Sequence, residues 1–377
     1  MSANEFHLIH SLHSTHDAFR RATIKKVTEY PLEGSCAVKV DIVDDQLIVV
    51  DSDSLVTKFE QNGTVIGQDD TEELQCAICN SLSKVVAINK CRDGYEAWMI
   101  ECGCDARSAK GDPLDIQSLA MVKDGKVVGV LDRNVASFNS MKCQMSSSFF
   151  VVANKETLIY RESTTKKLVQ VKWSDIENRD FNAWEYLKVP DQVKEEPVAS
   201  FCLNSIGRYA VLWENGQFIG SDEKQIISEP LLENQKVWNL VKQAIGNQLL
   251  LSSTGAIPDS AAVGQNLLLY NKSTKKYSRA SIPTDPSSTY STSLQALVPA
   301  FTGRHNLVYV AVSLSGTIHI VQCTDKSVSV LLADYTVAGP RDWCLSVTCV
   351  GSKGSCIDVY VSTAYHNALV KLKLTLM

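Results

Sequence analysis

Short segments in which apolar and polar residues alternate run along most of the chain. In residues 370–376, valine and leucine alternate with lysine and threonine, so one face of the segment is apolar and the other is polar. Such alternation is typical of half-buried strands, and it predicts strands at 46–52, 55–60, 149–154, 157–163, 306–314, 317–323 and 370–376. Helical periodicity is confined to 17–27, 175–187 and 236–245. The pattern predicts an all-β protein.

Glycine-containing turns separate many of these apolar runs. Asn-Gly and Asp-Gly pairs supply the two positive-φ positions of a type I′ turn, whose twist matches that of the flanking strands. In the segment RYAVLWENGQFIG, the pair at 215–216 predicts a hairpin between strands 209–213 and 217–219. Similar turns are predicted at Gly63, Gly94, Gly125 and Gly316.

The number of hairpins selects the architecture. A β-propeller uses four strands in each blade and about 40–50 residues per blade, so the 377 residues predict a single propeller domain, 1–377, with seven blades. We expect the ring to be closed by strands from both termini, with residues 5–12 beside strands in 347–374. Residues 173–198 are charged and break the alternation, which predicts a surface insertion with a short helix. The blade boundaries that we expect are 36–72, 73–112, 113–142, 143–196, 197–235, 236–290 and 291–340.

Composition indicates the class of protein and the cellular compartment that we expect. The chain has 45% hydrophobic and 21% charged residues, which is typical of globular proteins. No segment approaches the roughly 18 apolar residues of a membrane span, and the first thirty residues lack a signal-peptide core. We therefore expect an intracellular protein without membrane contact, in which the 12 cysteines are reduced and mostly buried.

Three clusters have residue types that bind metals or transfer protons. Histidines recur at every third position in HLIHSLHSTH, cysteines gather between 76 and 104, and carboxylates pair at 44–45, 51–53 and 69–73. On an extended strand, the histidines and a Cys-x-x-Cys pair point to opposite faces, so we expect packing or solvated side chains, while the double-Cys turn in ECGCD leaves zinc binding open as the alternative for the cysteines. We expect the carboxylates to cap turns. The residues of the first two clusters are His7, His10, His13, His16, Cys76, Cys79, Cys91, Cys102 and Cys104.

No Gly-x-Ser-x-Gly elbow or phosphate-binding Gly-x-x-x-x-Gly-Lys-Ser/Thr loop is present. We assign no catalytic, cofactor-binding or metal-ligating residue and expect no small-molecule substrate. The net charge of −5 argues against a surface built throughout for phosphates, although local basic clusters leave contact with RNA open. Those clusters are Arg20, Arg21, Lys25 and Lys26, and Lys272, Lys275, Lys276 and Arg279.

Two resemblances refine the picture. The strand pattern resembles the WD-repeat propeller superfamily, although the usual Gly-His and Trp-Asp dipeptides are missing and only KWSD and PRDW come near. Residues 246–283, together with 120–131 and 148–163, resemble the N-terminal propeller of the nucleolar protein eleven family. That resemblance implies small-subunit ribosome assembly and a nuclear or nucleolar location, with the cytoplasm as the alternative. It carries over no site residue.

The sequence therefore favours a non-catalytic propeller that holds surface loops for protein partners in a multi-subunit assembly. Rigid blades fix the loops, so a partner pays little ordering cost when it binds. The alternative hypothesis is a propeller enzyme, a hydrolase or lyase, whose carboxylates or histidines converge at the axial channel.

Overall fold

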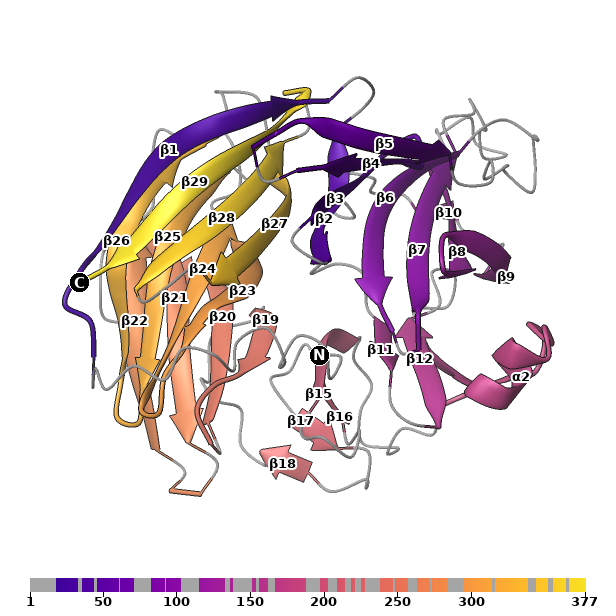
Figure 1. The fold of residues 1–377 in the computed structure, drawn as a ribbon. Coiled ribbons are helices and arrows are strands. Elements are labelled where there is room, and N and C mark those ends of the chain that lie inside the picture. Colours follow the sequence, from indigo (N-terminus) through magenta and orange to yellow (C-terminus); the bar gives the residue numbers. More distant parts are fainter. Residues whose placement is uncertain are drawn as a thin grey trace.

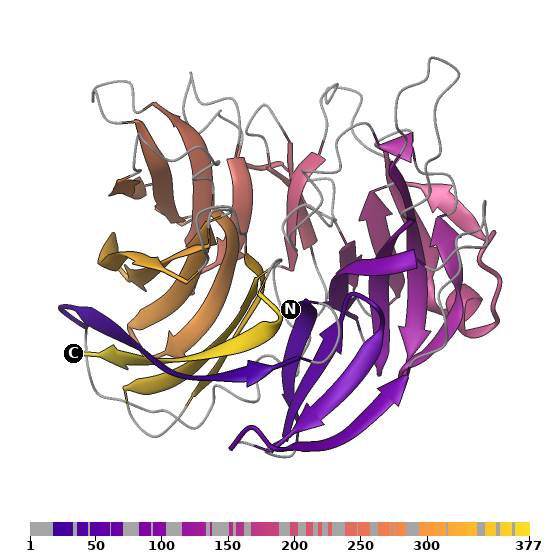
Figure 2. The same cartoon turned by 90° about the horizontal axis from the view of Figure 1, so that it is seen from above.

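In the computed structural model the chain folds into a ring of antiparallel sheets, a β-propeller (Figure 1, Figure 2). The residues that the structure describes are 18–32, 36–43, 46–60, 62–70, 83–91, 93–102, 115–132, 136–137, 151–153, 156–161, 167–187, 197–202, 209–213, 218–220, 225–227, 238–246, 248–256, 263–271, 273–274, 276–283, 294–313, 316–337, 344–351, 355–363 and 366–377.

These residues form seven sheets, six of four strands and one of five. The predicted all-β propeller is confirmed, and seven as the blade number of the whole ring stays a prediction. The first three sheets in chain order contain β2 (Ala37–Val43), β3 (Gln46–Asp51), β4 (Leu55–Phe59) and β5 (Val65–Asp70); then β6 (Ser83–Lys90), β7 (Tyr95–Cys102), β8 (Asp115–Lys123), β9 (Lys126–Asp132) and β10 (Ala136–Ser137); then β11 (Val151–Ala153), β12 (Thr157–Arg161), β13 (Leu168–Lys172) and β14 (Trp184–Tyr186).

Three further sheets follow the same up-and-down order. They contain β15 (Pro197–Cys202), β16 (Tyr209–Trp213), β17 (Phe218–Gly220) and β18 (Gln225–Ile227); β19 (Trp238–Gln243), β20 (Gln248–Ala256), β21 (Val263–Asn271) and β22 (Lys276–Pro283); and β23 (Leu294–Thr302), β24 (Asn306–Ser313), β25 (Thr317–Thr324) and β26 (Val328–Thr336). The last sheet, here called the closing sheet, combines β27 (Cys344–Gly351), β28 (Cys356–Thr363) and β29 (Ala368–Leu376) with β1 (Ala22–Pro31).

Closure of the ring joins the two ends of the chain, as predicted, but with a different segment. The strand β1 pairs antiparallel with β29, from Ala22 opposite Leu376 to Pro31 opposite Ala368. The helix predicted at 17–27 is therefore wrong over 22–27, because sheet pairing outweighs a helical pattern in so short a segment. Residues 5–12, which were expected to make this pairing, lie outside the described residues.

One predicted blade boundary is wrong. The strands β7 and β8 pair from Tyr95 opposite Lys123 to Cys102 opposite Ile116, so segments 73–112 and 113–142 contribute to one sheet. The other expected boundaries enclose one sheet each, because every long loop there separates the fourth strand of one sheet from the first of the next. The sequence of 73–142 resembles two blades because it contains two Asp-Gly hairpins at close spacing.

Two of the predicted glycine turns have the type I′ backbone, whereas at Asn62-Gly63 the glycine has a positive φ of 94° and the asparagine does not. Asp93 and Gly94 have φ values of 51° and 78°, and Asp124 and Gly125 have φ values of 49° and 79°. Two consecutive positive φ angles define the type I′ turn. Strands β16 and β17 pair across the predicted Asn-Gly turn at 215–216, so that hairpin is confirmed.

The other two helix predictions have different outcomes. Residues 238–243 form strand β19, so the helix predicted at 236–245 is wrong there. Within the predicted insertion, α2 is a single short helix (Trp173–Glu177), and 184–186 form β14, the last strand of its sheet. Trp173 and Ile176 of α2 are buried, and this fastens the helix to the core.

The hydrophobic core lies between neighbouring sheets. Each buried cluster draws side chains from the facing surfaces of two sheets, which is how a propeller buries both faces of each blade. Removing this apolar area from water is the main favourable term that holds adjacent blades together. Examples of facing pairs within one cluster are Val49 with Tyr360, Val50 with Trp98, Met121 with Val169, Leu250 with Tyr309, and Phe301 with Val359.

Candidate interaction surfaces

Most members of the histidine and cysteine clusters lie outside the described residues. These are His7, His10, His13, His16, Cys76, Cys79 and Cys104. Cys91 is buried, and burial raises the pKa of its thiol to about 12. A protonated thiol is a poor metal ligand. Within the described part of the chain, no group of three or more His, Cys, Asp and Glu residues could hold a metal ion.

Two carboxylates of the predicted acidic pairs, Asp51 and Asp69, make contacts within the sheet of β2 to β5. Asp51 accepts hydrogen bonds from the backbone N–H groups of Asp53 and Leu55, both at 2.9 Å, and so caps the turn between β3 and β4. Asp69 pairs with Lys58 on the neighbouring strand at 2.6 Å. Asp44 and Asp45 and residues 71–73 lie outside the described residues.

A part-buried ion cluster joins two sheets. The Lys39 ammonium on β2 contacts Asp41 at 2.9 Å and also bonds Glu96 on β7, whose carboxylate accepts a 2.8 Å hydrogen bond from the Trp98 indole. Burial by itself lowers the pKa of Lys39, but the two carboxylates outweigh it and raise that pKa above its ordinary value. These contacts link β2 of one sheet to β7 of the next.

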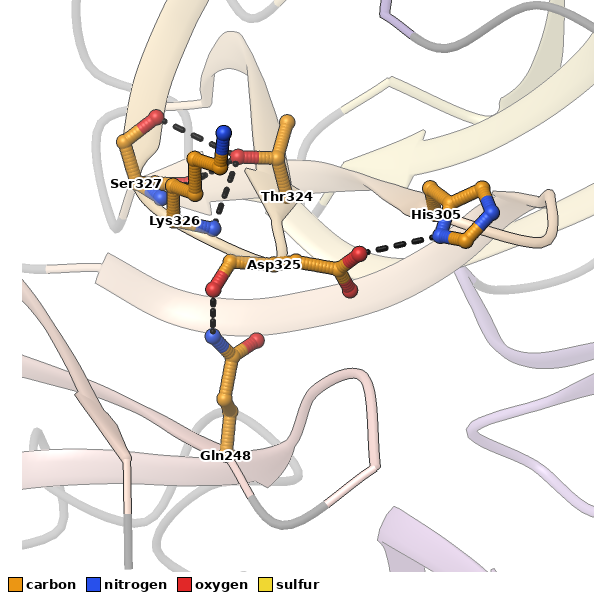
Figure 3. Close-up of polar contacts among 6 residues, drawn as sticks. All are labelled: Gln248, His305, Thr324, Asp325, Lys326 and Ser327. Carbon is orange, nitrogen blue, oxygen red and sulfur yellow. Dashed lines mark hydrogen bonds and ion pairs between the residues drawn. The ribbon is translucent and has the colours of Figure 1, made fainter. Parts of the chain in front are cut away.

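The turn between β25 and β26 is bound to its surroundings from three sides (Figure 3). The Gln248 amide at the start of β20 donates to the Asp325 carbonyl oxygen at 2.9 Å, and the Asp325 carboxylate lies 2.9 Å from Nδ1 of His305. Within the turn, the Thr324 hydroxyl oxygen accepts from the backbone N–H of Lys326 at 3.3 Å and of Ser327 at 3.1 Å. These bonds hold the turn against β20 and the β23–β24 turn.

Two further contacts bring distant segments to the same end of the sheet. The backbone N–H of Val328 donates to the Ser278 hydroxyl of β22 at 3.0 Å. Phe19 exchanges two backbone hydrogen bonds with the Gln322 side chain of β25, at 2.8 and 3.2 Å, and its ring meets Phe301 edge to face. The start of β22 and the segment that leads into β1 therefore flank the β25–β26 turn.

This arrangement collects cations. Five basic residues, which we call the basic corner, are exposed on these segments, and Asp325, which is engaged with His305, is the only acidic side chain of described residues 18–21, 273–274, 276–279, 302–306 and 324–328. The corner unites part of both basic clusters that the sequence analysis identified; Lys272 and Lys275 lie outside the described residues, and Arg279, next to Ser278, lies on the opposite face of β22. Its members are Arg20, Arg21, Lys276, Arg304 and Lys326.

Beneath the corner lie buried amides without partners. Gln248 is 5% exposed and its Oε1 has no hydrogen-bond partner among the described residues. Asn306 is 0% exposed, and neither its Oδ1 nor its Nδ2 has one. A buried polar atom without a partner costs about 1–3 kcal/mol, which is a reason to look for a ligand.

A second surface lies on β14, the outermost strand of its sheet. Trp184 and Tyr186 are each 41% exposed, and their rings meet edge to face with centroids 5.2 Å apart. The Lys167 ammonium lies 5.0 Å from the centroid of the Tyr186 ring. We call Trp184, Tyr186 and Lys167 the aromatic rim.

The aromatic rim extends an apolar sheet face into solvent. Trp184 lies opposite Val171 and Tyr186 opposite Val169, and both valines belong to the buried cluster shared with the preceding sheet. Glu185, between the two aromatics, lies on the other face and accepts a hydrogen bond from Gln170 at 2.7 Å. Among the described residues, β14 is the outermost strand of its sheet.

The sequence analysis did not identify either the basic corner or the aromatic rim as one surface. Trp184 and Tyr186 at i and i+2 are a signal for one face of a strand, but the segment was assigned to a helix. Arg304 and Lys326 are isolated charges in the sequence, and only folding places them beside Arg20 and Arg21.

Comparison with known proteins shows the fold alone. No protein-family model and no curated protein matches the chain. Among solved structures, the N-terminal domain of Nup159 is 11% identical, with 97% of this chain and 98% of that chain covered and a TM-score of 0.53. A structure of S. cerevisiae Dbp5 bound to Nup159, Gle1, IP6 and ADP contains a chain that is 12% identical, with 96% and 97% covered and a TM-score of 0.52. None of the described helices has the length and hydropathy of a membrane span.

Proposed function

We propose that this chain is a non-catalytic β-propeller scaffold that docks protein partners in a multi-subunit assembly, with the aromatic rim as a docking surface. The observation that carries the proposal is the exposed Trp184–Tyr186 pair on β14, the outermost described strand of its sheet. Tryptophan and tyrosine are enriched among residues that dominate protein–protein binding energy. An open edge strand also offers backbone groups to an added strand.

The partner that fits this surface is an extended protein segment. It adds beside β14 and covers the two rings with an apolar side chain. Little ordering cost falls on the propeller, because β14 is held by its pairing with β13. The comparison adds support from the fold, since Dbp5 is bound to Nup159 in one of the similar structures.

The test is a comparison of co-purifying proteins between the wild-type chain and the Trp184→Ala/Tyr186→Ala variant, each expressed with a tag in its native cells. We expect a defined set of proteins to fall at least about tenfold, because hot-spot truncations cost 2 kcal/mol or more. The matched control is Val65→Ala/Ile66→Ala, which removes two exposed apolar residues from another outermost strand, β5. Retention of the whole set by the rim variant would contradict the proposal.

We further propose that the assembly is a precursor of the small ribosomal subunit and that the protein is nucleolar. The support is the sequence resemblance of residues 246–283, a segment that contributes β20, β21 and β22 to one sheet. A fluorescent fusion should coincide with a nucleolar marker, and the tagged chain should co-purify with small-subunit precursor RNA. A fusion confined to the cytoplasm would exclude this assembly while leaving the docking function standing.

A further inference from the structure

We infer that the basic corner binds an acidic, extended segment of a partner protein. The corner is a second site, on other sheets than the aromatic rim, and the inference does not depend on that rim. Three independent features of the described residues carry it: a turn held in place from several sides, an excess of positive charge, and buried hydrogen-bonding atoms without partners.

The turn between β25 and β26 is held in place by hydrogen bonds before any ligand binds. Its Asp325 carbonyl oxygen, its Asp325 carboxylate and the Val328 N–H that follows are each bonded to a different segment, as described above. The Lys326 side chain is exposed at the tip of this fixed turn, and Arg304 is exposed on the adjacent β23–β24 turn. A surface whose backbone is already ordered loses little entropy when a ligand binds.

Charge selects the ligand. The corner has five exposed cations and one acidic side chain, Asp325, among its described residues, so an anionic ligand gains attraction from several directions and its approach is accelerated. The rest of the molecule carries an excess of negative charge, because the net charge of the whole chain is −5. An acidic segment is therefore directed to this corner rather than to the surface at large.

The Gln248 acceptor favours a polypeptide over a nucleic acid. Gln248 Oε1 needs a donor, which every non-proline residue of a peptide backbone provides, whereas in RNA the phosphates that cations hold do not donate and only the 2′-hydroxyl and base N–H groups do. Figure 3 shows the Gln248 side chain directly under Asp325, whose carboxylate points toward His305. The exposed aromatics of the described chain, Trp184 and Tyr186, which would serve for base stacking, lie on a different sheet.

The experiment measures binding of three fluorescein-labelled probes to the full chain by anisotropy: a peptide of alternating Glu and Gly, one of alternating Lys and Gly, and oligouridylate. We expect the acidic peptide to bind in a salt-sensitive manner and the basic peptide not to bind. Arg20→Glu/Lys326→Glu should weaken binding of the acidic peptide at least about tenfold, because two attractive charges become repulsive. The matched control, Lys126→Glu/Lys172→Glu, reverses two exposed lysines of other sheets and should change binding less than about twofold.

A second variant tests the Gln248 amide, both its Oε1 acceptor and its Nε2 bond to Asp325, without a change in charge. Gln248→Met preserves the side-chain length and should weaken binding of the acidic peptide about fivefold, with the melting temperature recorded alongside. Failure of the acidic peptide to bind would overturn the inference. So would binding of oligouridylate alone with the same sensitivity to Arg20→Glu/Lys326→Glu, since that result assigns the corner to nucleic acid. Neither result bears on capture through the aromatic rim.

Discussion

The basic corner and the aromatic rim occupy equivalent places on the propeller and present opposite chemistry. Both lie at the outermost strands of their sheets, where the chain passes from the third strand to the fourth. At the corner this passage is a short turn (Thr324–Ser327) with one exposed cation, Lys326, whereas near the rim it contains α2 and the acidic residues Asp175, Glu177 and Asp180. The rim adds two exposed aromatics, and the corner adds buried amides without partners.

The difference shows that blade geometry determines where a docking surface can form, but not what it binds. Backbone pairing places both surfaces at the edge of the ring, and the side chains decide between apolar burial and charge attraction. The two modes also respond differently to conditions. Binding at the corner should weaken with salt, because exposed charges are screened, whereas binding at the rim should change little.

The largest effect is expected from Trp173→Ala, which removes the anchor beneath the rim. Trp173 is buried, and its ring lies 5.6 Å from that of Tyr95. The loss should cost about 3–5 kcal/mol of unfolding free energy, measured by chemical denaturation, and should abolish capture of rim partners. Binding of the acidic peptide should persist below the unfolding temperature; a parallel loss of both would show that the surfaces are not separate.

Phe19→Ala should give the opposite pattern. The Phe19 ring packs against Phe301 and fixes the segment that carries Arg20 and Arg21. We expect a destabilisation of about 3 kcal/mol, at the low end for a buried phenylalanine because the site is near the end of the folded segment. Affinity for the acidic peptide should fall, while capture at the rim should be preserved. If peptide affinity stays at the wild-type value, the arginines do not belong to the binding surface.

Lys39→Met tests the ion cluster that links β2 to β7, on sheets other than those of the two surfaces. Removing the ammonium leaves Asp41 and Glu96 without their cation, and we expect a loss of about 2–3 kcal/mol, less than for a fully buried pair because the Lys39 side chain is 16% exposed. Both binding activities should be unchanged at neutral pH.

The contribution of the Lys39 ammonium to folding stability should decrease as the pH rises. The pKa of Lys39 is raised in the folded state, so the contribution of the ammonium is fully present below the unfolded pKa of about 10.4 and is lost as pH rises through the folded pKa. Wild-type stability should therefore approach that of Lys39→Met in strongly alkaline solution. Denaturation measured from neutral to alkaline pH checks this; a constant difference would contradict the assignment.

The smallest effect is expected from Asp325→Ala. The His305–Asp325 pair is about half exposed, so its loss should change stability by no more than about 0.5 kcal/mol. Since Asp325 is the only acidic side chain among the described residues of the corner, affinity for the acidic peptide should rise about two- to threefold. Asp69→Ala, which removes an exposed carboxylate paired with Lys58 on another sheet, is the control and should leave affinity unchanged.

Local chemistry made much of the fold predictable. Strand 370–376 and the Asp-Gly turns at 93–94 and 124–125 follow from side-chain alternation and from the φ angles that glycine and aspartate tolerate. Segments 22–27 and 238–243 were misassigned because a run of about ten residues with mixed spacing fits both periods. Pairing with β29 and β20 decided their conformation.

What the sequence by itself determined is the repeated hairpin, because each strand and turn depends on neighbours a few residues away. Only the tertiary structure decided which hairpins share a sheet, as with β6 to β10, and which surfaces arise between sheets. Gln322 holds Phe19 across a separation of 303 residues, and by this contact Arg20 and Arg21 reach the turn of Lys326. Burial of apolar area between blades drives such contacts, and it depends on the closed ring rather than on any local segment.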